Sequence, residues 1–188
     1  MVPEVEELTG GEPETTVVEN ARRKAIAGME TAASEGDLVL GVDTEVVLDG
    51  RLLGKAGNEG EAREGLEALA GRTHEVLSGV VLIDAAGPAL NAGAPPSVPD
   101  PRPEERSGVE RSLVTFRELS DPLIDAYLAS GEWRDRAGAY AVQGLGSGFV
   151  QRLDGDLSNV IGLPVSLLLE LAPDLLDQPG DSGSQSVF

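Results

Sequence analysis

The spacing of apolar residues predicts alternating helices and strands. Over residues 14–35, apolar side chains recur every three or four positions, as on the buried face of a helix, and Gly36 follows as a stop signal. The continuous apolar run 38–42 is typical of a strand that is covered on both faces. Further strands are predicted over residues 73–84 and 109–119. This interleaving predicts an α/β fold with a mixed β-sheet and flanking helices.

Turn and capping residues delimit the shorter elements. Asp49 and Gly50 form a strong two-residue hairpin signal. Asn58, with Glu61 three residues later, resembles a capping box and opens a predicted helix. The remaining predictions are a strand over residues 2–8, a helix that begins after Ser120 and ends at Gly131, and a last helix over residues 164–176 that Pro173 interrupts.

Composition separates one folded domain from two segments of weaker folding tendency. The chain has 188 residues, of which 40% are hydrophobic, and this suffices for a single core within residues 1–176. Residues 85–108 are rich in Pro, Gly, Ala and Arg, so they bury too little apolar surface to offset their ordering entropy. We therefore expect a mobile insertion there and a disordered polar tail over residues 177–188.

The charge balance excludes several classes of partner. The formal net charge is −19, which argues against binding to a nucleic acid polymer or to an anionic membrane surface. No apolar run approaches the roughly 20 residues that span a bilayer, and the acidic N-terminal segment does not resemble a signal peptide. The absence of Cys excludes disulfides and thiolate chemistry. These features predict a cytoplasmic protein.

The stretch 133–164 has the highest density of special backbone positions and polar side chains. It contains the glycine cluster 144–148, Arg136, Gln143 and an aspartate-rich turn. Packing alone seldom requires such a combination, so we interpret the stretch as the floor of a ligand site. The glycine cluster superficially resembles a dinucleotide loop, but strand-like residues follow it, and a tight turn is favoured.

The inventory of reactive residues favours phosphate chemistry. The sequence has no GxxxxGK[ST], HExxH or GxSxG motif, and its single histidine, His74, cannot build a poly-His metal site. It does have carboxylates, clustered Arg and two lysines, Lys24 and Lys55. Carboxylates suit a hard divalent cation, and cationic side chains neutralise phosphate oxygens. Structural alternatives remain open at this point: Asp43 could cap a turn, Lys24 could lie on a solvated helix face, and Gln143 could satisfy backbone groups.

Four sequence blocks resemble the Maf family of nucleoside triphosphate pyrophosphatases. They are GVDTEVVLDGRLLGK, AGRTHEVLSGV, DRAGAYAVQG and GDLSNVIGLP, and with ENARRKA in the first helix the similarity covers residues 3–171. The resemblance implies a twisted mixed sheet in two lobes around a central cleft, as in inosine triphosphate pyrophosphatases. It also implies hydrolysis of a nucleoside triphosphate to the monophosphate and pyrophosphate with a divalent cation, Mg²⁺ or Mn²⁺. The AGAYxxQG pattern is similar to the branch that prefers dTTP and UTP, and similar proteins form homodimers.

The resemblance also implies roles for matching positions. Asp43 matches an aspartate proposed as base or metal ligand, Lys24 and Lys55 match two functional lysines, and Glu6 matches an acidic position near the metal. Gln143 matches an active-site glutamine.

A mechanism follows as an expectation from these matches. Water attacks the α-phosphorus while Asp43 orients or deprotonates it, and Asp43 and Glu6 hold the cation. Lys24, Lys55 and Arg136 offset charge on the leaving pyrophosphate. Gln143, which carries both donor and acceptor atoms, reads a pyrimidine edge.

The sequence also departs from the family pattern. Family members begin with a strand and a Ser-x-Ser-Pro-Arg-Arg segment that binds phosphate, and this segment is absent from the sequence. Ala56 stands where the family usually has Pro, Arg136 stands where it has Lys, and the insertion 85–108 is long. The first departure predicts an N-terminally truncated domain. Either the true start lies upstream, or the protein is an inactive truncated copy. A competing hypothesis is a non-catalytic nucleotide-binding or cell-division-linked protein.

Overall fold

The fold is built around one five-stranded β-sheet with the strand order β2-β1-β3-β4-β5. A computed structural model describes residues 5–32, 37–85 and 105–176. Within these ranges, no helix combines the length and the apolar character that crossing a bilayer requires. In chain order, the elements are α1 (Pro13–Ala32), β1 (Leu38–Leu48), β2 (Arg51–Leu52), α2 (Glu59–Leu69), β3 (Thr73–Asp84), β4 (Glu105–Phe116), α3 (Asp121–Ser130), the 3₁₀ helix η1 (Gly144–Phe149), β5 (Val150–Asp154), α4 (Leu157–Ile161), α5 (Val165–Leu171) and the 3₁₀ helix η2 (Pro173–Leu175).

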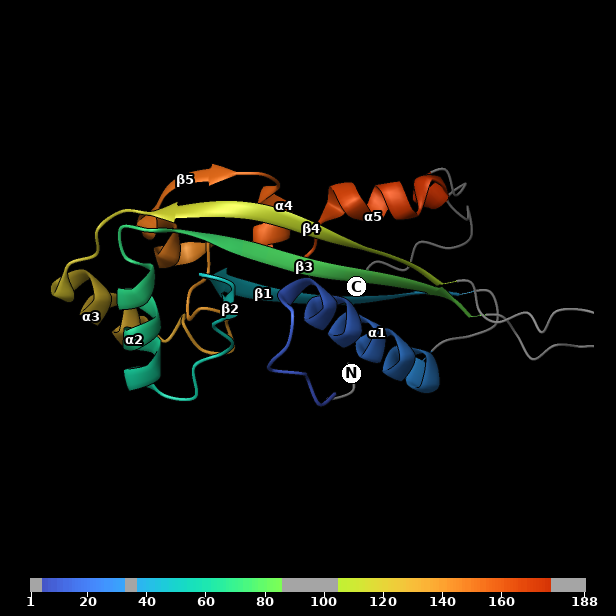
Figure 1. The fold of residues 1–188 in the computed structure, drawn as a ribbon, viewed down its shortest axis with the longest axis horizontal. Coiled ribbons are helices and arrows are strands. Elements are labelled where there is room, and N and C mark those ends of the chain that lie inside the picture. Colours follow the sequence, from blue (N-terminus) through green and yellow to red (C-terminus); the bar gives the residue numbers. More distant parts are fainter. Residues whose placement is uncertain (1–4, 33–36, 86–104, 177–188) are drawn as a thin grey trace, which may run out of the picture.

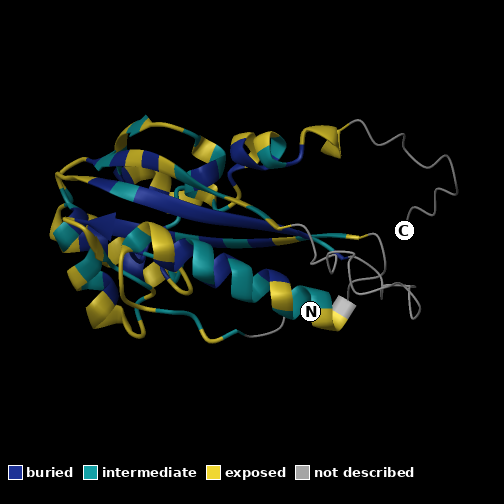
Figure 2. Ribbon diagram, turned by 45° about the vertical axis from the view of Figure 1, so that its right-hand side comes forward, coloured by how far each residue is buried: buried dark blue, intermediate teal, exposed yellow. Residues whose placement is uncertain are grey.

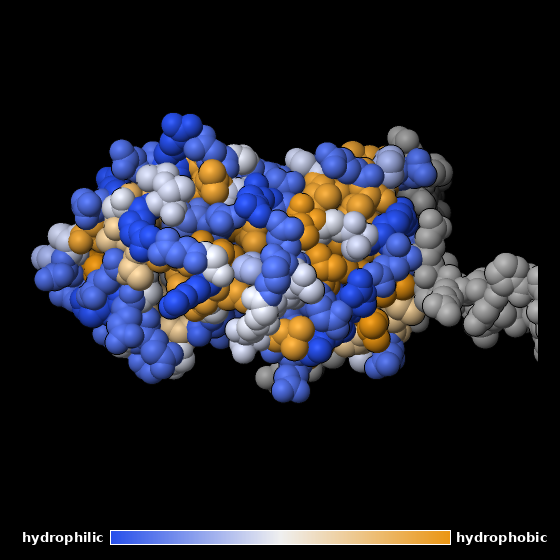
Figure 3. Space-filling view, viewed as in Figure 1, coloured by the Kyte–Doolittle hydropathy of each residue, from blue (hydrophilic) through white to orange (hydrophobic). Residues whose placement is uncertain are grey.

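Helices cover both faces of the sheet. Figure 1 shows α1 along one face, α4 and α5 on the other, and α2 beside α3 at the end of the sheet near β2. Figure 2 shows that burial is concentrated along the central strand β3, whose residues are mostly buried. On the side drawn in Figure 3, hydrophilic side chains dominate the end that carries α2 and α3.

Two glycines allow α1 to lie directly on the sheet. A Cβ atom at Gly41 of β1 would lie 2.0 Å from the carbonyl oxygen of Ala21, and one at Gly79 of β3 would lie 2.4 Å from the main chain of Val17. The side chains of Val17, Ala21 and Ala25 are fully buried against the sheet. Any larger residue at either glycine would push the helix away, so these positions fix the distance between α1 and β1.

Several local predictions are confirmed. The helix predicted over 14–35 is α1 in the described residues, and the strand predicted over 73–84 is β3. Asp49 and Gly50 have φ angles of 52° and 74°, as a type I′ hairpin requires. The N-cap of α2 is also confirmed, since the Glu61 main-chain N–H donates to Asn58 Oδ1 at 3.0 Å.

One strand prediction is confirmed in longer form and another is wrong. The apolar run 38–42 is the first part of β1, which continues to Leu48 and pairs with β3 without interruption from Leu38 to Val47. Asp43 is therefore in mid-strand. Residues 5–8 of the predicted first strand form no strand. The side-chain amide of Asn20 takes the place of a neighbouring strand, bonding to the main-chain N–H and C=O of Leu8 at 2.7 and 3.1 Å.

The expected α/β class with helices that flank a β-sheet is confirmed, although all the described strand pairs are antiparallel. The predicted mobile insertion 85–108 is too long at both ends. Ala85 donates its main-chain N–H to Asp37 at 2.8 Å, and β4 already begins at Glu105, opposite Ile83. Sheet pairing outweighs the unfavourable composition there. Residues 86–104 and the predicted tail 177–188 lie outside the described residues.

Candidate active site

The candidate site lies at the outer edge of β1 and has one half on each face of this strand. The short strand β2 pairs only with Val47 and Leu48, so residues 38–45 have no strand on their outer side in the part of the chain that the structure describes. Side chains alternate along a strand. Asp43 and Glu45 therefore lie on the face that α1 covers, whereas Thr44 and its even-numbered neighbours lie on the opposite face.

On the α1 face, carboxylates and lysines form a group that we call the acid–lysine cluster: Glu7, Lys24, Asp43, Glu45 and Lys55. Lys24 Nζ lies 2.5 Å from Asp43 Oδ1 and 2.7 Å from Glu7 Oε1. Lys55 Nζ lies 3.0 Å from the other Glu7 oxygen. Because one carboxylate bridges both ammonium groups, the helix α1 and the loop after β2 are joined electrostatically.

The same contacts perturb the pKa values of the partners. Burial would lower the pKa of the Lys24 ammonium, but hydrogen bonds to Asp43 and Glu7 outweigh it and raise that pKa. Burial would raise the pKa of Glu7, yet the two lysines outweigh it and lower that pKa. Asp43 is only 4% exposed, and its second oxygen accepts a hydrogen bond from Asn20 Nδ2 at 3.1 Å. The Lys24 ammonium and the Glu7 carboxylate are therefore held in their charged forms.

Glu45 differs from the rest of the acid–lysine cluster. It is 7% exposed, and its Oε2 atom has no hydrogen-bond partner among the described residues. Burial, with further repulsion from Asp43 and Glu7, raises the pKa of its carboxyl to about 7. Sequence reasoning missed this residue. The available signal was its spacing, since a residue two positions from Asp43 in one strand must share its face.

The opposite face of β1 borders a cavity of about 250 Å³. Its walls are of mixed polarity, and Thr44, Lys55, Arg136 and Gln143 are among its polar lining residues. The remaining lining residues are Val42, Val46, Val76, Asp135, Ala137, Tyr140, Ala141, Val142, Val160, Ile161 and Gly162. Most of these residues come from the stretch 133–164, so the stretch predicted to form the floor of a ligand site lines a cavity.

Hydrogen bonds hold the chain segment that carries Gln143. The Tyr127 hydroxyl accepts from the main-chain N–H of Ala141 at 3.0 Å, and the Tyr140 hydroxyl lies 2.9 Å from His74 Nε2. Burial lowers the pKa of His74 to about 4, so the imidazole is neutral at ordinary pH. The interpretation of His74 as structural fits this buried position. Both tyrosines fix the cavity wall just before Gln143.

The structure brings together most of the residues nominated from sequence. Lys24, Asp43 and Lys55 meet in the acid–lysine cluster. Arg136 and Gln143 line the cavity on the opposite face of β1. Lys55 belongs both to the acid–lysine cluster and to the cavity lining.

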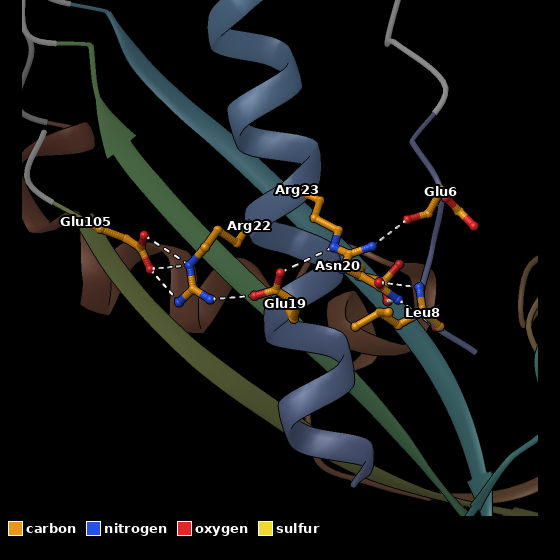
Figure 4. Close-up of polar contacts among 8 residues, drawn as sticks. Glu6, Leu8, Glu19, Asn20, Arg22, Arg23 and Glu105 are labelled. Atoms are coloured by element: carbon orange, nitrogen blue, oxygen red, sulfur yellow. Dashed lines mark hydrogen bonds and ion pairs between the residues drawn. The ribbon is translucent and has the colours of Figure 1, made fainter. Parts of the chain in front are cut away.

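Glu6 is the exception. Its side chain is exposed, and its contact with α1 is made by its main-chain oxygen, which accepts from Arg23 Nη1 at 3.1 Å (Figure 4). Glu7 instead reaches the two lysines. Adjacent side chains in an extended segment point in opposite directions, so a shift of one residue exchanges the two positions.

The donor set is compatible with a divalent cation, although it is not a complete cage. Among the described residues, no group of three or more acidic or histidine side chains is arranged to hold a metal ion. Mg²⁺ commonly uses one or two carboxylates together with substrate phosphates. Asp43 and the unpaired carboxylate of Glu45 provide such a partial set, while the Lys24 ammonium lies between Asp43 and Glu7.

Comparison with known proteins identifies the family to which the chain belongs. A protein named dTTP/UTP pyrophosphatase from Bacillus cereus (strain AH820) is 42% identical over 171 residues, which cover 90% of this chain and 80% of that protein. A protein of the same name from Thermococcus onnurineus is 42% identical over 166 residues, or 88% of this chain and 79% of that protein. The family described as Maf-like protein matches residues 1–175, and the chain therefore belongs to the Maf family.

Proposed function

We propose that this protein is a nucleoside triphosphate pyrophosphatase that hydrolyses dTTP and UTP to the monophosphate and pyrophosphate. The names of the relatives support this activity. One structural observation carries the proposal: the only two lysines of the chain converge on one carboxylate, Glu7, beside a cavity that Lys55 also lines. Arg supplies every other cationic side chain apart from His74, so the placement of both lysines here is selective.

Both lysines are suited to binding a triphosphate. Each ammonium is bound by carboxylates, and a strongly anionic triphosphate would compete with these carboxylates for the same donors. Lys55 is the more accessible, with 48% of its side chain exposed against 23% for Lys24. The transfer of Lys24 from Asp43 to phosphate would release a carboxylate oxygen for chemistry.

In the proposed reaction, the oxygen of a water molecule attacks the α-phosphorus, and the bond from that phosphorus to the bridging oxygen breaks. Asp43 orients the water and accepts its proton, and pyrophosphate leaves. Lys24, Lys55 and Arg136 offset the charge that develops on the leaving group. A bound Mg²⁺ or Mn²⁺, held by Asp43, would supply further positive charge to the phosphate oxygens.

The cavity is proposed to hold the base. The valine and alanine side chains of its lining would cover the faces of a ring, and the Gln143 amide offers both a donor and an acceptor to a pyrimidine edge. Because Lys55 lines this cavity and also contacts Glu7, base and phosphates would lie on opposite sides of one strand edge.

Release of pyrophosphate tests the proposal directly. The purified protein is incubated with dTTP, UTP, CTP or GTP and with Mg²⁺ or Mn²⁺, and pyrophosphate is measured. We expect turnover with dTTP and UTP. Failure to release pyrophosphate from any of these nucleotides would overturn the proposal. Nucleotide binding in calorimetry without turnover would instead support the non-catalytic alternative.

We further propose that the enzyme acts in the cytoplasm as a homodimer, with residues 1–176 as a single domain. Light scattering after size-exclusion chromatography tests the dimer, and a monomer mass across the working concentration range would contradict it.

A further inference from the structure

Glu45 is the carboxylate of the acid–lysine cluster that forms no ion pair with either lysine. The cluster contains three carboxylates and two ammonium groups. Both ammonium groups are engaged by Glu7 or Asp43, and neither forms an ion pair with Glu45. The Oε2 atom of Glu45 is buried and has no hydrogen-bond partner in the described ranges.

Packing does not account for a carboxylate at this position. Glu45 is 7% exposed, and the next residues of β1, Val46, Val47 and Leu48, are buried apolar side chains. Val47 shares the face of Glu45 and packs with Val17 and Leu77 in a small apolar cluster. An apolar side chain would continue this cluster, whereas an unpaired buried carboxylate costs free energy. The residue therefore needs a partner that the described chain does not supply.

The surroundings define the chemistry of that partner. Asp43 lies two residues away on the same face of β1, so the two carboxylates approach one region from one strand. Nearby Glu7 adds further negative charge, and these neighbours repel the ionised form of Glu45. Oxygen donors with excess negative charge favour a hard cation. A second anion or an apolar ligand would leave the buried oxygen unpaired.

We propose that Glu45 is a cation ligand and that it holds a divalent metal ion together with Asp43. The inference deepens the proposed function, since this ion would be the one that assists phosphate hydrolysis. Both proposed ligands belong to the protein, so Mn²⁺ binding can be measured without a nucleotide, although the carboxylates are only a partial ligand set. Glu45 takes the role that the sequence analysis gave to Glu6, whose exposed side chain lies outside the acid–lysine cluster.

Titration with Mn²⁺ alone tests this site. Electron paramagnetic resonance of unbound Mn²⁺ gives the affinity of the wild-type protein, of Glu45→Gln and of Glu170→Gln. The last variant makes the same chemical change at an exposed position of α5, which packs on β3 and β4. We expect Glu45→Gln to weaken Mn²⁺ binding by about tenfold or more, and Glu170→Gln to leave it unchanged.

Thermal unfolding provides a second measurement that separates a lost ligand from a damaged fold. Without metal, Glu45→Gln should melt at the wild-type temperature or above it, because the substitution removes an unpaired buried charge. Added Mn²⁺ should raise the melting temperature of the wild type and of Glu170→Gln, but should raise that of Glu45→Gln much less.

The proposal is overturned if the wild type shows no saturable Mn²⁺ binding, or if Glu45→Gln binds Mn²⁺ with wild-type affinity. These outcomes are distinguishable from failure of the proposed function. A protein that binds Mn²⁺ through Glu45 but releases no pyrophosphate refutes the function alone. If the protein releases pyrophosphate and Glu45→Gln leaves its Mn²⁺ affinity unchanged, only the assignment of Glu45 as a metal ligand is refuted.

Discussion

The two faces of β1 differ in the side chains that border them. On the α1 face, Asp43 is buried, and Lys24 and Asn20 bind its two oxygens. On the opposite face, Thr44 pairs its hydroxyl with that of Ser78 at 2.7 Å, and the cavity is lined by apolar side chains together with Lys55, Asp135 and Arg136. Neighbouring residues of one strand thus border a buried ion cluster on one face and a cavity of mixed polarity on the other. Under the proposed function, this difference would separate phosphate chemistry from base recognition.

Lys55 joins the two faces. It lies beyond the edge of β1, where an isolated bridge to Ala137 and a hydrogen bond from Gly138 N–H to Gly54 O at 2.8 Å hold its backbone. Its ammonium contacts Glu7 while its side chain lines the cavity. A substrate that spans both halves would have to pass this residue, so Lys55 provides the strongest test of the comparison.

Replacement of Lys55 should have the largest effect. We expect Lys55→Ala to lower kcat/KM for dTTP by about 10²- to 10³-fold, because a preorganised donor to the phosphates is lost. The free energy of unfolding should change by no more than about 0.5 kcal/mol, since the side chain is half exposed. Steady-state kinetics and urea unfolding measure both quantities. Arg51→Ala, an exposed cation on β2, is the control, and an equal loss of activity there would contradict the assignment.

His74 tests the support of the cavity wall through pH, because its imidazole lies 2.9 Å from the hydroxyl of the lining residue Tyr140. Its folded-state pKa of about 4 lies below the ordinary value of 6.5, so the fold favours the neutral imidazole. Stability from this residue is complete above pH 6.5 and is lost as the pH falls toward 4. The loss amounts to about 3 kcal/mol.

Urea unfolding of wild type and His74→Gln between pH 4 and pH 7 measures the effect. The variant should be less stable at neutral pH because His74 contacts Phe116 and Tyr140, but its stability should fall less steeply with acid. Parallel pH curves for the two proteins would show that the imidazole is not the titrating group.

Gln143 should produce the smallest effect. If it contacts the base and not the phosphates, Gln143→Ala should raise KM for dTTP and UTP by about tenfold and leave kcat nearly unchanged. The exposed Gln151 on β5 offers a matched control as Gln151→Ala. A fall in kcat without a change in KM would place Gln143 at the reacting phosphate and remove the separation between the two faces.

Local physics allowed much of the fold to be predicted from sequence. The helical spacing of α1, the apolar run of β3, the Asp49-Gly50 turn and the Asn58 cap each depend on residues close in the chain. Likewise, the motif blocks identified Lys24, Asp43 and Lys55, which the structure brings together.

The sequence by itself therefore determined the main helices and strands, the family resemblance and the identity of the two lysines. Only the tertiary structure decided that Asp43 lies between Lys24 and Asn20 on the face of β1 that α1 covers. It also placed Glu7 rather than Glu6 beside the lysines and left Glu45 buried without a partner in the described residues. Such choices depend on which face of a chain segment meets which distant neighbour. Long-range packing sets that face, and a shift of one residue in an extended segment reverses it.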